Sequence, residues 1–203
     1  MKDILDTPFV YRLWQAPFNH QKVAPVREYE HLWRGKSVLD IGCGPGINVG
    51  LFESASRYVG IDVNEEYVRR AAQKVAGDLS CTFIHHDALE SLPINYQPDV
   101  LFCSSVLHHF SDQQVDIFFS RLRELTQREV PFLLVDLLLP DERGIPRFLA
   151  KADRGDFARG ESHWLDLLRR HLGFDQLIPL PIKLGSVVLW KHFFLCGSLK
   201  GRD

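Results

Sequence analysis

A glycine-rich turn near residue 40 is the clearest candidate for a ligand-binding feature. Residues 40–46 read DIGCGPG, and a buried strand that ends in such a turn lets a ligand approach the backbone amides closely. Dinucleotide-binding turns follow the spacing G-x-G-x-x-G, whereas Ile47 stands here in place of the third glycine. Asp40, directly before the turn, disfavours a pyrophosphate and favours a ligand that carries an ammonium group.

Two further acidic residues end apolar runs of the same kind. Asp62 follows the run Tyr58–Ile61, where a carboxylate can accept hydrogen bonds from both hydroxyls of a ribose. Asp87 ends the next run, where a carboxylate can accept a hydrogen bond from the amino group of an adenine. With Asp40, three acidic strand ends in register predict one site for a nucleoside-like ligand at one edge of a sheet.

These segments resemble the successive motifs of class I S-adenosylmethionine (AdoMet)-dependent methyltransferases of the type 11 and type 12 kind. The motifs are VLDIGCGPG (38–46), GID (60–62), HDA (86–88) and SSVLHHF (104–110), and the resemblance covers roughly residues 37–140. It implies AdoMet as methyl donor and S-adenosylhomocysteine as product. It also implies a methionine site at the glycine turn, ribose at Asp62 and adenine at Asp87. The expected cofactor-binding residues are Asp40, Gly42, Cys43, Gly44, Gly46, Asp62, Val63, His86, Asp87, Ala88, Ser104 and Tyr11.

The residues after the fourth apolar run are the candidates for the acceptor side. DNA and RNA amino-methyltransferases of similar fold carry Asp/Asn-Pro-Pro-aromatic there, and C5-methyltransferases need a Pro-Cys pair. Cys103, Ser104 and Ser105 stand there instead, which favours a small-molecule oxygen or nitrogen acceptor and no nucleic-acid partner. Methyl transfer requires in-line approach and often a base. His108 is the first candidate for that base and His109 the second, because neutral imidazole titrates near working pH. The alternative is that one histidine packs in the loop and the other faces water.

A basic segment between residues 143 and 159 gives candidates for substrate recognition. If it is helical from Pro146, then Arg147, Lys151 and Arg154 share one face. Arg154 or Arg159 would then grip an anionic acceptor, a carboxylate or a phosphate. The alternative is a solvated basic face. Near the N-terminus, Tyr11 is the candidate for an aromatic lid over the sulfonium.

The elements that must position these residues alternate between strand and helix patterns. Short apolar runs predict strands at Val38–Ile41, Tyr58–Ile61, Thr82–Ile84, Asp99–Cys103 and Phe132–Leu139. Helical spacing predicts helices at Ile4–Trp14, Lys22–Trp33, Glu65–Val75, Asp112–Arg128 (with Asp112 as N-cap) and Glu161–Leu172. Two further runs, Phe174–Leu180 and Val187–Leu195, predict a hairpin around Gly185.

This order predicts an α/β fold with a Rossmann-like doubly wound seven-stranded sheet, mostly parallel with an antiparallel C-terminal hairpin. We expect a single methyltransferase domain over residues 1–203. Its parts are N-terminal helices and lid (1–35), an AdoMet-binding core (36–140), a substrate-side insertion (141–173) and a closing hairpin (174–203).

Composition restricts the class of protein further. The 203 residues are 45% hydrophobic and 25% charged with a net charge of −2, as in a globular domain without a general affinity for nucleic acid or membranes. Four widely spaced cysteines predict reduced thiols, and the N-terminus lacks the apolar run of a signal peptide, so we expect a cytoplasmic protein. A metal site at His85 and His86 is not expected, because neighbours on a strand face opposite ways. A non-catalytic AdoMet-binding scaffold and, less favoured, an NAD-dependent oxidoreductase remain the alternatives.

Overall fold

The computed structural model describes residues 18–200, with gaps at residues 77, 79, 127 and 154. The expected helix Ile4–Trp14 lies outside this range, and so do the lid candidate Tyr11 and the substrate candidate Arg154.

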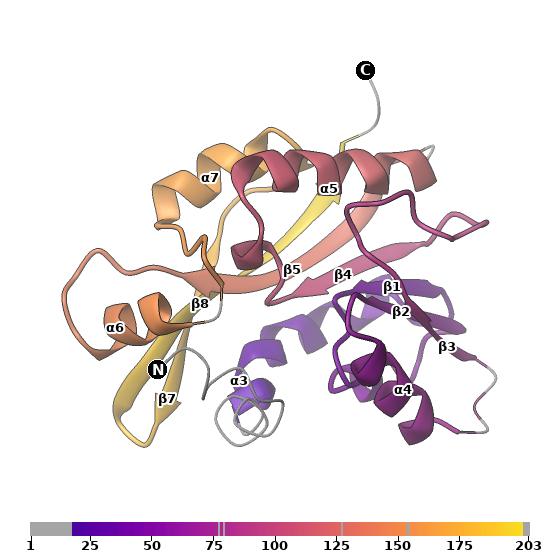
Figure 1. The fold of residues 1–203 in the computed structure, drawn as a ribbon, viewed down its shortest axis with the longest axis horizontal. Coiled ribbons are helices and arrows are strands. Elements are labelled where there is room, and N and C mark those ends of the chain that lie inside the picture. The colour runs from indigo at the N-terminus through magenta and orange to yellow at the C-terminus, as the bar shows by residue number, and fades with distance from the viewer. Residues whose placement is uncertain (1–17, 77, 79, 127, 154, 201–203) are drawn as a thin grey trace.

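The core of the molecule is one eight-stranded mixed sheet (Figure 1). Its order is β3-β2-β1-β4-β5-β8-β6, with β7 also paired to β8. β1 to β5 run parallel to one another, and β8 runs antiparallel to β5 and to β7, so the expected mostly parallel sheet with an antiparallel closing hairpin is confirmed. The strands are β1 Ser37–Ile41, β2 Arg57–Asp62, β3 Cys81–His85, β4 Val100–Ser104, β5 Val130–Leu138, β6 Leu172–Gly173, β7 Ile178–Leu184 and β8 Val187–Leu199.

The sheet has one strand more than the seven predicted. The long strand β8 pairs with β5 along one edge. Its other edge pairs with the two-residue strand β6 at Leu199 and with β7 between Val187 and Phe194. Two short strands therefore share one position beside β8. The first strand of the hairpin begins at Ile178 rather than Phe174, and Gly185 supplies the positive φ of 60° in its turn.

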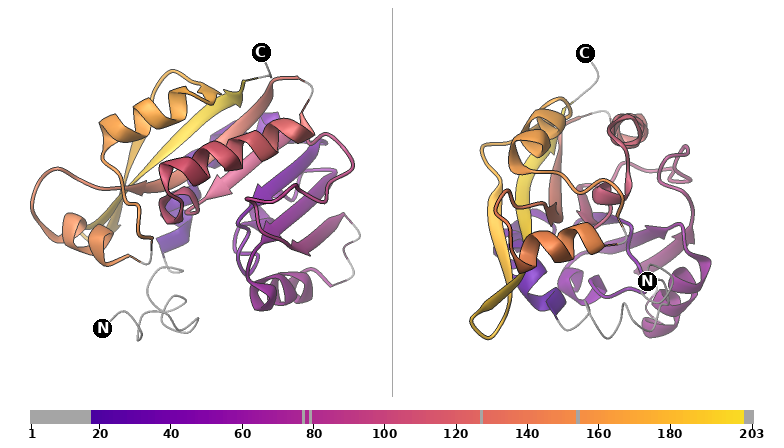
Figure 2. Two further views of the ribbon diagram at one scale, coloured as in Figure 1. Left: turned by 45° about the horizontal axis from the view of Figure 1, so that its top comes forward. Right: turned by 60° about the vertical axis from the view of Figure 1, so that its left-hand side comes forward.

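Helices cover both faces of the sheet, as the doubly wound prediction requires (Figure 2). The helices α5 (Asp112–Leu125) and α7 (Glu161–Arg169) bury Phe118, Phe119 and Trp164 against one face. On the other face, α3 (Asn19–Val23) and the 3₁₀ segments η2 (Pro25–Leu32) and η3 (Val49–Phe52) share a cluster with Trp33 and Phe52. The remaining segments are α4 (Glu65–Lys74), η4 (Leu107–His109) and α6 (Ile145–Ala152). None of the helices in the described ranges is long and apolar enough to cross a bilayer.

Local chemistry explains two departures from the predicted helices. The single helix expected over Lys22–Trp33 is wrong: it divides at Pro25, whose missing N–H and ring disfavour an uninterrupted helix. The N-cap of α5 is Ser111 rather than Asp112, because Ser111 and Gln114 form a reciprocal capping box. The carboxylate of Asp112 instead accepts hydrogen bonds from Arg159 and His163.

Candidate active site

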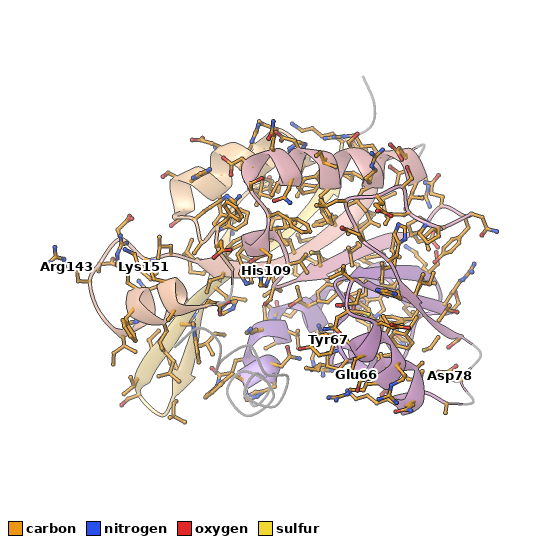
Figure 3. All side chains as sticks on the ribbon, in the orientation of Figure 1. Glu66, Tyr67, Asp78, His109, Arg143 and Lys151 are labelled. Atoms are coloured by element: carbon orange, nitrogen blue, oxygen red, sulfur yellow. The ribbon has the colours of Figure 1, made fainter. Side chains whose placement is uncertain are left out.

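A cavity of about 590 Å³ opens at the carboxyl ends of the parallel strands. This is the size of a small-molecule or cofactor site, and it lies at the edge where open α/β sheets bind ligands. Tyr67 of α4 and His109 of η4, both labelled in Figure 3, belong to its wall. The wall consists of Gly42, Gly44, Pro45, Ile61, Asp62, Val63, Asn64, Tyr67, His86, Asp87, Ala88, Leu89, Ser104, Ser105, Val106, His109, Phe110 and Gln114.

The glycines of the first turn have different tasks. Gly42, Gly44 and Gly46 all have positive φ, at 76°, 53° and 69°. A Cβ on Gly42 would lie 2.1 Å from Cγ2 of Val106, so this glycine lets the turn after β4 approach closely. A Cβ on Gly44 would meet nothing within 4 Å, and Gly44 lines the cavity. Its backbone therefore faces open space in which a ligand fits.

The acidic residue at the end of β2 is held in place by backbone amides. Asp62 accepts hydrogen bonds from the amides of Gly44 and Asn64, each at 2.8 Å. Burial raises the pKa of this carboxyl above its ordinary value, and the two amides oppose that rise. The neighbouring Val63 lines the cavity and is 66% exposed, so it offers an apolar surface to a ligand.

The residues after β3 complete this side of the cavity. Asp87 lines it together with His86 and Ala88, and Oδ1 of Asp87 accepts the amide of Leu89 at 2.9 Å. The structure thus brings the predicted ribose carboxylate and the predicted adenine carboxylate to one cavity. The residue types and the volume fit a nucleoside-bearing cofactor.

Asp40 lies behind the cavity rather than in its wall. The hydroxyl of Tyr58 donates to Oδ2 of Asp40 at 2.5 Å, whereas Oδ1 has no partner among the described residues. Burial raises the pKa of Asp40 to about 7, against the lowering effect of the Tyr58 hydrogen bond. A buried oxygen without a protein partner is a place for an ordered water or a ligand donor. Cys43 and Gly46 also do not reach the cavity wall.

Of the two histidines predicted as bases, the structure brings only His109 to the cavity. His108 is 3% exposed, with its Nδ1 2.5 Å from Oδ1 of Asp136 and its Nε2 3.3 Å from Oδ1 of Asp153. Burial alone would lower the pKa of His108, but the two carboxylates outweigh it and raise that pKa to about 9. His108 is therefore a cation at neutral pH, and the geometry favours His109 as the base.

The predicted substrate residue Arg159 is also buried. Its guanidinium donates to Asp112 and to the carbonyls of Leu107, Phe110 and Phe157. Arg159 therefore ties the insertion to the turn after β4 and is not part of the cavity wall. The other basic residues of the insertion that Figure 3 labels, Arg143 and Lys151, lie at the edge of the molecule away from Tyr67.

Ser105 and Lys22 add features to this region that the sequence motifs do not predict. Ser105 lines the cavity and has a φ of 60°, a strained value for a residue other than glycine. Nζ of Lys22 lies 3.4 Å from Oγ of Ser105, and burial lowers the pKa of Lys22 to about 8. Phe110 is the last residue of the fourth motif and Gln114 follows it closely in sequence, whereas Lys22 lies on α3 and no motif links it to the site.

Within the described ranges, no group of three histidine, cysteine or acidic side chains is arranged to hold a metal ion. The four cysteines are free, and Cys43 and Cys103 are buried.

Comparisons with known proteins bear on the same region. Residues 38–129 match the sequence model of a family described as "Methyltransferase domain". The tRNA U34 carboxymethyltransferase of Photobacterium profundum is 31% identical over 102 residues, which cover 47% of this chain and 30% of that protein. The chain thus aligns with less than a third of that relative's length.

Solved structures match over nearly the whole chain. YcgJ from Bacillus subtilis has a TM-score of 0.70 at 20% identity, over 91% of this chain and 100% of that one. The N-methyltransferase NodS from Bradyrhizobium japonicum, in complex with S-adenosylhomocysteine, has 0.73 at 15% identity, over 96% and 94%. Magnesium protoporphyrin IX methyltransferase from Synechocystis, with bound S-adenosylhomocysteine, has 0.67 at 20% identity, over 91% and 84%.

The strand order, the antiparallel β8 and the cavity at the carboxyl edge define a Rossmann-like methyltransferase fold. Residues 38–129 match a methyltransferase-domain family, and the fold of the chain is that of solved AdoMet-dependent methyltransferases. Both findings agree with the resemblance that the sequence motifs carry.

Proposed function

We propose that this chain transfers a methyl group from AdoMet to an oxygen or nitrogen of a small-molecule acceptor by in-line displacement, releasing S-adenosylhomocysteine. The observation that carries the proposal is the cavity that joins the glycine turn, Asp62, Asp87 and the turn after β4. When bound, AdoMet supplies an electrophilic methyl group on a sulfonium. Two of the structures named above, NodS and magnesium protoporphyrin IX methyltransferase, are methyltransferases with bound S-adenosylhomocysteine, which supports the same donor here.

The chain's own groups divide the cavity into a donor part and an acceptor part. The open backbone at Gly44 would receive the methionine moiety, Asp62 would accept hydrogen bonds from the ribose hydroxyls, and Asp87 would accept one from the adenine amino group. Val63 would cover the adenine ring. The acceptor part lies between Ser105, His109, Phe110 and Gln114, where His109 is the group that can take the acceptor's proton.

A small uncharged or weakly charged acceptor suits this part best. None of the described residues in the cavity wall is a lysine or an arginine, which favours a small acceptor over a polyanionic nucleic acid. An anionic acceptor would need a cation such as Arg154, outside the described residues, because Arg159 is committed to four other acceptors.

Two assays test the proposal. A thermal shift with AdoMet or S-adenosylhomocysteine, and none with NAD, is expected; a shift with NAD alone would favour an oxidoreductase. Release of S-adenosylhomocysteine is then measured with phenols, catechols, aliphatic alcohols, primary amines and bulk tRNA. Turnover with a small acceptor supports the proposal, turnover with tRNA alone contradicts the acceptor class, and binding without turnover on any acceptor indicates a scaffold. Comparing charged and neutral acceptors with the wild type and Arg154→Ala tests anion recognition.

A further inference from the structure

Both ring nitrogens of His108 face a carboxylate. Nδ1 lies 2.5 Å from Asp136 on β5, and Nε2 lies 3.3 Å from Asp153, which follows α6. An ionised carboxylate only accepts hydrogen bonds, so each nitrogen must carry a proton for both contacts to be favourable. The ring is therefore an imidazolium, clamped at both ends.

Asp136 is fixed by the backbone as well as by His108. Oδ2 accepts a hydrogen bond from the amide of Leu107 at 2.8 Å, and Oδ1 accepts one from the amide of Leu137 at 2.7 Å. Burial would raise the pKa of Asp136, but the positive charge of His108 and these amides hold it below its ordinary value. The pair is a charge-assisted contact between the turn after β4 and strand β5.

The insertion packs on His108 through its backbone. The amide of Phe157 donates to the carbonyl of His108 at 3.0 Å. A Cβ on Gly155 would lie 2.1 Å from Cδ2 of His108, so only glycine lets the chain pass this close to the ring. Asp153, Gly155 and Phe157 therefore all lie against His108, the first two at its ring and Phe157 at its backbone carbonyl.

His109 lies on the other side of this clamped ring, at the cavity. The two imidazole rings are 4.3 Å apart at their centroids and inclined by 36°. A buried imidazolium disfavours a second positive charge on a ring beside it, which suits a base that must be neutral before it accepts a proton. The titratable and charged groups around His108 are Asp136 on β5, Asp153 after α6, Lys22 on α3, His192 on β8 and His109 on η4.

We propose that His108 is a positioning residue: its doubly protonated ring, clamped between Asp136 and Asp153, fixes the ring of His109 at the acceptor end of the cavity. This inference rests on the proposed function. It assigns the two adjacent histidines different tasks, one to hold the site and one to accept the proton. It also gives the insertion a task, because Asp153 supplies one end of the clamp.

The test combines spectroscopy without an acceptor and kinetics with one. Protein labelled with ¹⁵N-histidine and saturated with S-adenosylhomocysteine is titrated by long-range ¹H–¹⁵N NMR. At pH 7.5 both nitrogens of His108 are expected to be protonated, and Asp153→Asn is expected to lower the midpoint of His108 by about one pH unit. Asp166→Asn removes the same charge from the exposed face of α7 and is expected to change nothing.

The kinetic measurements use the acceptor, among those tested above, with which the wild type releases S-adenosylhomocysteine fastest. Asp153→Asn is expected to lower kcat about tenfold, with unchanged affinity for S-adenosylhomocysteine, because the base is misplaced while the donor part is intact. The loss of activity at high pH, near pH 9 in the wild type, should move to lower pH. His109→Gln should remove the base and cost more than Asp153→Asn.

Three results would overturn the inference. One is an unprotonated ring nitrogen on His108 at pH 7.5, and another is an Asp153→Asn variant with wild-type kcat and pH profile. The third is a His109→Gln variant with full activity beside an inactive His108→Gln variant that still binds S-adenosylhomocysteine, because His108 would then be the base. A wild type that transfers no methyl group refutes the proposed function and the positioning role together, and the NMR titration then shows whether the clamp exists without the reaction.

Discussion

The proposed donor side and the proposed acceptor side of the cavity are built in different ways. On the donor side, the glycine turn, Asp62 and Asp87 each follow the strand that positions them, and their partners are mostly backbone amides close by in sequence. On the acceptor side, His108 reaches Asp136 and Asp153, and Ser105 meets Lys22 from α3. A binding site for a fixed cofactor can therefore be local, whereas the side that adapts to an acceptor depends on tertiary contacts between charged groups.

The largest expected effect is a loss of stability when the buried carboxylate of the acceptor side, Asp136, is removed. Asp136→Leu removes the carboxylate that His108 and two amides share, and it leaves a buried cation with one partner. Loss of one member of a buried ion pair costs about 4 kcal/mol of unfolding free energy. Urea denaturation at pH 7 measures this loss.

Asp141→Leu is the matched control, because Asp141 is exposed on the loop after β5. It should change the unfolding free energy by less than about 0.5 kcal/mol. Equal stability of Asp136→Leu and the wild type would show that the ion pair of Asp136 and His108 does not stabilise the acceptor side.

The second prediction concerns the glycine turn of the donor side, which a single added methyl group should distort. Gly42→Ala places a Cβ 2.1 Å from Val106 at a φ of 76°, so strain and overlap add to about 3 kcal/mol. The variant should also lose measurable binding of S-adenosylhomocysteine by calorimetry, because the turn must move.

Gly35→Ala is the control that separates the cost of backbone strain from the cost of overlap with Val106. Gly35 has a φ of 69°, a Cβ added there would meet nothing within 4 Å, and the residue does not line the cavity. The substitution should cost about 1 kcal/mol and leave binding intact. A Gly42→Ala variant no worse than Gly35→Ala would contradict the close approach to Val106.

These two sides also differ in what the sequence could predict. The strands β1 to β5 follow from short apolar runs, and the carboxylates Asp62 and Asp87 stand at or just after the ends of two of these runs, so local sequence pattern predicts them. The burial of His108 depends on Asp136, 28 residues away, and on the insertion, so no local signal separates it from His109. For the same reason the sequence does not predict that Arg159 is buried, because its four hydrogen-bond acceptors come together only in the folded chain.

The third prediction sharpens the donor side by removing one polar contact. Asp62→Ala deletes the proposed ribose acceptor and should weaken the binding of S-adenosylhomocysteine about thirtyfold, or about 2 kcal/mol, by calorimetry. The exposed carboxylate of Asp78, outside the cavity, supplies the control, and Asp78→Ala should bind normally. Unchanged affinity in Asp62→Ala would move the ribose site elsewhere.

The smallest effect is the pH dependence of stability that the buried imidazolium imposes. The pKa of His108 is raised from its ordinary 6.5 to about 9, so the stability it contributes is complete below pH 6.5 and is lost as pH rises through 9. Between pH 7 and 8 the unfolded chain has already released this proton and the folded chain has not. The wild type should therefore lose about 1 kcal/mol of unfolding free energy over this step.

Two other buried groups titrate nearby with opposite signs, which is why a variant is needed. Asp40, with its pKa raised to about 7, adds a smaller loss over the same step, and Lys22, with its pKa lowered to about 8, adds a smaller gain. His108→Gln keeps both groups and removes only the imidazolium, so its unfolding free energy should stay nearly flat from pH 7 to 8. A wild type with the same flat profile would mean that His108 is neutral when folded, and the acceptor side would then lack the fixed charge that sets it apart from the donor side.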